Sequence, residues 1–109
     1  MNRPPLDIPL DDLPECMRPY KRVIDKYGHS GTELDLGHYV DECTADEYYE
    51  LSWFAQEFDP FYPIVWQWRQ DVGGIVDSQA AKAVFYAASL AIVADDDRID
   101  RKKNGLPPR

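Results

Sequence analysis

Apolar residues recur along much of the chain at the three- and four-residue spacings of amphipathic helices. The longest such pattern predicts a helix from Ser78 to Asp96, with Asp77 as its N-cap. Seven alanines within it would let neighbouring elements approach closely, so we expect a core helix. Its apolar stripe consists of Ala81, Val84, Phe85, Ala88 and Ile92.

A helix from Thr44 to Asp59 has the clearest start and stop signals. Thr44 followed three residues later by Glu47 forms a capping box, and Pro60 ends the helix after Phe58 or Asp59. An apolar stripe along one side should attach this helix to the core. The stripe consists of Tyr48, Leu51, Ala55 and Phe58.

The segment 61–72 fits a helix better than a strand. Pro63 suits the first turn of a helix, and apolar residues follow at spacings of four, three and four before Gly73-Gly74. These residues are Phe61, Val65, Trp68 and Val72. A strand is the alternative, because Ile64, Trp66 and Trp68 alternate with polar residues.

The N-terminal third of the chain gives weaker signals. A Pro-rich arm precedes a helix from Pro14 to Tyr27, for which Gly28 can supply the C-terminal cap. Pro19 lacks a backbone donor, so the regular helix can also start there. Gly-rich residues then predict a loop over 29–40, and alternation from Leu34 to Val40 allows a short strand within it.

These elements predict a mainly α fold: a small single-domain bundle of about four helices, with a short strand or hairpin as an option between the first and second. A chain of 109 residues can bury one apolar core without metal or disulfide bonds. We expect a Pro-rich arm over 1–13, a helical domain over 14–97 and a basic, flexible tail over 98–109.

The net charge of −8 is concentrated in one part of the chain. Residues 27–68 contain nine acids and no Lys or Arg, whereas residues 1–26 sum to zero and residues 69–109 to +1. All three Trp residues lie in the same acidic segment. The charge disfavours binding to nucleic acid or to an anionic membrane, and suggests a basic protein partner.

Carboxylates form a row on one side of the 44–59 helix. At about 100° per residue, Asp46, Glu50 and Glu57 fall within about 40° of one another, with Trp53 among them. Like charges at this spacing destabilise a helix, so the row favours a binding role. The alternative is a solvated face, with Trp53 covered by the arm or by 61–72. The candidate partner-binding residues are Glu42, Asp46, Glu47, Glu50, Trp53, Glu57 and Asp59.

No arrangement of residues predicts a metal, a cofactor or a catalytic centre. The order Cys16, His29, His38, Cys43 contains no compact zinc-binding pair, and nothing places a Cys and a His together as nucleophile and base. The acids from Asp95 to Asp100 lack the Gly and Glu of a calcium loop. We expect reduced thiols and a protein that is not an enzyme.

The function that fits these features is binding. An acidic, aromatic surface can occupy a basic, often nucleic-acid-binding, surface of a partner, as anti-restriction or anti-CRISPR inhibitors that mimic nucleic acid do. One alternative is an immunity protein or antitoxin that neutralises a basic toxin. Another is a small structural or assembly component. The first residues of the chain show no export signal. No apolar segment of the sequence reaches the length that a helix needs to span a bilayer, so we expect a cytoplasmic protein.

Overall fold

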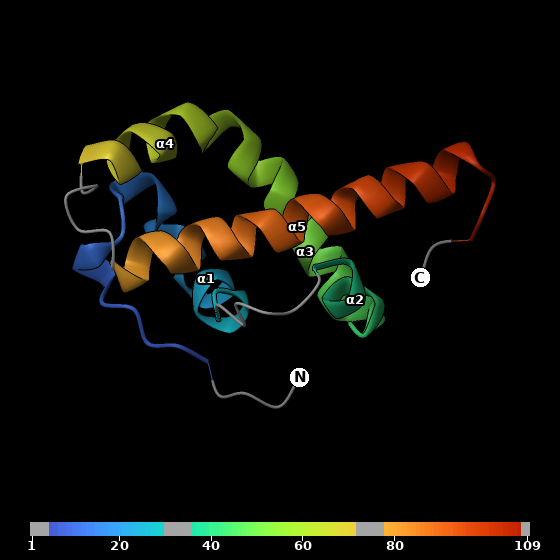
Figure 1. Ribbon diagram of the computed structural model, residues 1–109, viewed down its shortest axis with the longest axis horizontal. Coiled ribbons are helices and arrows are strands. Elements are labelled where there is room, and N and C mark those ends of the chain that lie inside the picture. Colours follow the sequence, from blue (N-terminus) through green and yellow to red (C-terminus); the bar gives the residue numbers. More distant parts are fainter. Residues whose placement is uncertain (1–4, 30–35, 72–77, 108–109) are drawn as a thin grey trace.

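Helices account for 81% of the residues described by the computed structural model, and no strand occurs among them. The described residues are 5–29, 36–71 and 78–107 (Figure 1). The α-helices are α1 (Lys21–Tyr27), α2 (Leu36–Asp41), α3 (Ala45–Phe58), α4 (Tyr62–Asp71) and α5 (Gln79–Lys103). Short 3₁₀-helices cover Leu10–Asp12, Glu15–Tyr20 and Asp59–Phe61. The prediction of a small, mainly helical bundle is confirmed.

The long helix α5 is the axis of the fold, and α1, α2 and α3 all pack against it (Figure 1). Its buried side is largely alanine, which lets the other helices come close. One close approach is at the end of α1, where a Cβ added to Gly28 would lie 2.7 Å from Cβ of Ala83. Large buried side chains from the surrounding helices complete the core: Ile24, Tyr27, Tyr48, Leu51, Phe54 and Phe58.

The predicted N-terminus of α3 is confirmed. Oγ1 of Thr44 accepts a hydrogen bond from the backbone N–H of Glu47 (3.2 Å), and Oε1 of Glu47 accepts one from the backbone N–H of Thr44 (3.0 Å). The predicted apolar stripe of α3 is buried. The predicted helix of the 61–72 segment is confirmed as α4 over Tyr62–Asp71, and the alternative of a strand is wrong there; Val72 lies outside the described residues.

The first predicted helix is only partly α-helical. Residues Glu15–Tyr20 form a 3₁₀-helix, and α1 starts at Lys21, two residues after Pro19. Proline removes a backbone donor and its ring blocks the preceding turn, which explains the late start. The arm packs on its own domain, because Ile8 is buried and its N–H donates to Oδ1 of Asp25 (3.0 Å).

The optional strand between the first two predicted helices is wrong where the structure describes it. Residues Leu36–Asp41 form α2, which packs on α5. Val40 is buried, and Leu36 and Tyr39 are partly buried against the core. Tyr39 and Val40 lie three and four residues after Leu36, which is a helical spacing. Contact with α5 favours this helix over the strand that the alternating pattern allowed. Leu34 lies outside the described residues.

Helix α5 begins and ends differently from the prediction. Its N-cap is Ser78, whose Oγ accepts from the N–H of Ala81 (3.3 Å), and Asp77 lies outside the described residues. The helix continues to Lys103 rather than ending at Asp96, so the first part of the predicted flexible tail is helical.

A C-terminal capping motif explains this longer helix. The N–H of Leu106 donates to the carbonyl of Arg101 (2.8 Å), and the N–H of Gly105 donates to that of Lys102 (3.3 Å). Gly105 has a φ of 69°, the left-handed conformation that this Schellman motif requires. The motif satisfies carbonyls that would otherwise lack partners at the end of α5.

Candidate functional site

The predicted carboxylate row of α3 is divided by its neighbour α1. Glu50 forms an ion pair with Arg22, and its Oε1 lies 3.9 Å from Nζ of Lys26. Oε2 of Glu47 lies 3.7 Å from the same ammonium group. The side chains of Glu47 and Glu50 are 17% and 21% exposed. These two candidate residues therefore already have basic partners within the molecule.

The pKa of Glu47 reflects this environment. Partial burial acts to raise it, but hydrogen bonds from Thr44 and the nearby ammonium of Lys26 outweigh burial and hold the pKa below its ordinary value. The hydrogen bond to Glu50 raises the pKa of the Arg22 guanidinium in turn. Both groups stay charged at neutral pH, so the contact between α1 and α3 is ionic.

The opposite side of the row faces solvent. Trp53 is 46% exposed and Tyr49 is 45% exposed, which is unusual for large aromatic residues on a helix with a buried side. The carboxylates of Asp46 and Glu57 form no ion pair with any described residue. We define the α3 face as Asp46, Tyr49, Trp53, Gln56 and Glu57.

Trp53 has one aromatic neighbour that the sequence did not indicate. Its ring centroid lies 5.7 Å from that of Tyr20, which is partly buried against the core. Burial, and after it the negative charge of Glu57, raises the pKa of the Tyr20 phenol. Tyr20 thus supports the indole from one side, and the arm and α4 do not bury it.

The remaining candidates lie next to the α3 face rather than on it. Glu42 is exposed just before α3, and Asp59 is exposed in the 3₁₀-helix that follows it. Two members of the face were not among the predicted residues. Tyr49 lies four residues before Trp53, and Gln56 three residues after it, so helical spacing alone could have added both.

The acids near the end of α5, for which the sequence gave no role, join α5 to α3. Oδ1 of Asp95 accepts from Oγ of Ser52 (2.7 Å) and from Nε of Arg98 (3.1 Å). Oδ2 of Asp97 accepts from the hydroxyl of Tyr48 (2.8 Å) and from Nε of Arg101 (3.0 Å). These carboxylates are structural, and each also orients an arginine side chain.

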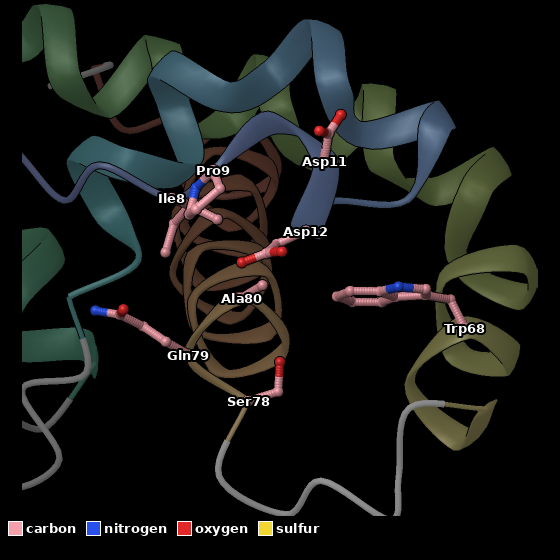
Figure 2. Close-up of a pocket in the computed structure, with 8 residues that line it drawn as sticks. All are labelled: Ile8, Pro9, Asp11, Asp12, Trp68, Ser78, Gln79 and Ala80. Carbon is pink, nitrogen blue, oxygen red and sulfur yellow. The ribbon is translucent and has the colours of Figure 1, made fainter.

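A cavity of about 440 Å³ lies apart from the α3 face, among the arm, α4 and the start of α5. Figure 2 shows the indole of Trp68 pointing from α4 towards Asp12 and the first turn of α5. Asp11 and Ser78 also line the opening. This cavity again combines carboxylates with an aromatic ring, and its charge favours a cationic occupant over an anionic one.

The residues considered as metal ligands do not form a cluster where they are described. Cys16 and Cys43 are free thiols, and burial raises the pKa of Cys16. Sγ of Cys43 donates to the carbonyl of Tyr39 at 3.4 Å. The side chain of His38 lies outside the described part of the structure. No three His, Cys, Asp or Glu side chains among the described residues are arranged to hold a metal ion.

No protein-family model, curated protein or solved structure matches this chain. In the described part of the chain, no helix has both the length and the apolar character needed to span a bilayer.

Proposed function

We propose that this chain is a non-enzymatic binding protein whose α3 face occupies a basic surface of a partner protein, and that it acts as an inhibitor. The observation that carries the proposal is Trp53, which is nearly half exposed on the same helix face as Asp46 and Glu57, two carboxylates without an ion pair to any residue that the structure describes. An exposed Trp costs solubility and contributes little to folding, whereas Trp and Tyr dominate the energetics of protein interfaces.

Charge defines the kind of partner. The chain carries −8, and its acids are concentrated in the segment that includes α3. Asp46 and Glu57 flank the two exposed rings, so a groove with Arg or Lys at its rim would meet both the charge and the apolar contact. A partner that normally binds nucleic acid has such a groove, and blocking it would inhibit that partner.

The division of the carboxylate row supports this proposal. The charges of Glu47 and Glu50 are balanced by Arg22 and Lys26. These two residues should therefore change the free energy of partner binding little in either direction. Within the row, Asp46 and Glu57 are the carboxylates that form no ion pair in the described part of the chain. A merely solvated face would need no exposed aromatic residues between its acids.

Site-specific crosslinking tests where the partner binds. A photoreactive phenylalanine analogue replaces Trp53 in one variant and Ile92 in the control, because Ile92 is 43% exposed on a different helix. Each variant is irradiated in a lysate of the organism that encodes the chain. The proposal predicts one crosslinked protein at position 53 that is absent at position 92 and has a basic binding surface.

Charge-reversal variants of the chain, tested for binding to the partner identified by crosslinking, then separate direct contact from long-range electrostatic attraction. Glu57→Lys should weaken binding about tenfold at low salt, and less at high salt, where charges are screened. Asp96→Lys makes the same charge change at an exposed position of α5 and should have a much smaller effect. Equal losses for the two variants, or affinity that is independent of salt, would contradict the proposal.

A further inference from the structure

A second and oppositely charged cavity lies at the other end of the molecule from the start of α5. It measures about 260 Å³ and is lined by Tyr49, Arg98, Arg101, Lys102 and Leu106. Three of its five lining residues are basic, in a chain whose net charge is −8. Such a local excess of cations calls for a physical explanation.

The two arginine side chains are held in place by the junction of α3 and α5. Nη2 of Arg98 lies 3.0 Å from Oδ1 of Asp95, and its Nε donates to Oγ of Ser52 (2.9 Å). Nε of Arg101 donates to Asp97, and its Nη1 donates to the carbonyl of Pro107 (3.3 Å). Two such contacts hold each guanidinium and leave it little freedom, so its orientation is set before a ligand arrives.

Donors remain after these contacts are made. Nη1 of Arg98, Nη2 of Arg101 and Nζ of Lys102 have no hydrogen-bond partner among the described residues. The side chains of Arg98 and Arg101 are 34% and 29% exposed, so water screens their charges less than at an open surface. Asp95 and Asp97 offset the two guanidinium charges, and Lys102 supplies the excess positive charge.

The cavity also has an apolar wall. The ring of Tyr49 and the side chain of Leu106 are 45% and 52% exposed, and both line it. Leu106 is brought back towards the helix by the capping motif at Gly105, whose φ of 69° disfavours any other residue. The wall is therefore built by the fold rather than by a freely moving terminus.

We propose that this cavity binds an oxyanion carried on a small aromatic or apolar group, either a phosphate monoester or a carboxylate. Guanidinium and ammonium donors form charge-assisted hydrogen bonds with such oxygens. The volume is below the range of about 300–1,000 Å³ for pockets that enclose whole drug-sized ligands, so one group of side-chain size fits. The site shares Tyr49 with the α3 face but selects the opposite charge, because its other polar lining residues are Arg98, Arg101 and Lys102.

The test is a titration of the full-length chain with phenyl phosphate, benzoate and inorganic phosphate, followed by backbone amide NMR. The proposal predicts saturable shifts confined to residues around Tyr49 and 98–106 with phenyl phosphate or benzoate, and the tighter of the two identifies the source. Inorganic phosphate should bind at least about threefold more weakly than phenyl phosphate, because it lacks the group that contacts Tyr49 and Leu106.

Matched variants distinguish a built site from general attraction of anions. Lys102→Gln should weaken phenyl phosphate binding about fivefold, whereas Lys103→Gln removes the same charge one residue away, outside the cavity lining, and should leave it nearly unchanged. Neither lysine belongs to the network that joins α3 and α5, so both variants should fold. Absence of saturable shifts, or equal losses for the two variants, would overturn the proposal.

Discussion

The acids of α5 and the acids of the α3 face look alike in sequence but have opposite roles in the structure. Asp95 and Asp97 accept hydrogen bonds from Ser52 and Tyr48 and pair with arginines of their own helix. Asp46 and Glu57 have no such partners among residues 5–29, 36–71 and 78–107. The role of an acidic cluster is therefore set by the donors that a neighbouring helix brings to it.

The same contrast divides α3 itself. Glu47 and Glu50 face the basic residues of α1, while Asp46 and Glu57 lie beside the exposed rings. Substitutions that affect stability should therefore map to acids that face another helix, and substitutions that affect partner binding should map to the α3 face.

Removing the carboxylate of Asp95 should have the largest effect on stability. Asp95→Ala leaves Arg98 without its ion pair and Ser52, a buried residue, without its acceptor. Hydrogen bonds to charged groups contribute about 1.5–3 kcal/mol, so the free energy of unfolding should fall by about that amount. Urea denaturation measures the loss.

The control for this variant is Glu57→Ala on the α3 face, which should change the free energy of unfolding by no more than about 0.5 kcal/mol. If both variants lost a similar free energy of unfolding, the acids of α5 would not be more important for stability than those of the α3 face, and the proposed difference would be wrong.

Charge reversal within α3 should have an intermediate effect. Glu50→Lys removes the ion pairs to Arg22 and Lys26 and places a third cation beside them, so it should destabilise the fold by about 1 kcal/mol. Glu57→Lys places a cation near the C-terminus of α3, where it is favourable, and should cost almost nothing. Thermal unfolding at low and at high salt measures both, and a difference that salt does not reduce would argue against an ionic cause.

The smallest effect concerns acid stability. The pKa of Glu47 is lowered in the folded protein, so its contribution to stability is fully present above its unfolded pKa of about 4.3 and is lost as the pH falls through the lower, folded value. Glu47→Gln cannot titrate. The stability advantage of the wild type over this variant should therefore be constant near neutral pH and shrink below about pH 4.3. An advantage that persists unchanged at low pH would exclude this role for Glu47.

Local signals predicted much of the fold. The capping box at Thr44, the proline after α3 and the apolar spacings of α4 and α5 depend on neighbouring residues only, and these predictions are confirmed. The late start of α1 also follows from a local signal, Pro19. Two features depend on distant contacts or on a terminal motif: helix α2 and the long end of α5. Helix α2 forms against α5, and the end of α5 depends on Gly105 and on ion pairs along the helix.

The candidate site was predictable to a similar extent. Helical geometry alone placed Trp53 on the side of α3 away from the core, and its exposure agrees with that. It could not show that α1 would supply Arg22 and Lys26 to Glu50, because those residues are far from it in sequence. For the same reason Tyr20, which supports Trp53, could be found only from the structure.

Trp53→Ala separates binding from folding when two quantities are measured with the same protein: the affinity for the crosslinked partner and the free energy of unfolding. A side chain that is 46% exposed contributes little to the core but can anchor an interface. We predict binding weakened by about tenfold or more, with unfolding changed by less than about 1 kcal/mol. Unchanged affinity, or a loss of binding that only follows a loss of folding, would contradict the assignment of the α3 face as the binding surface.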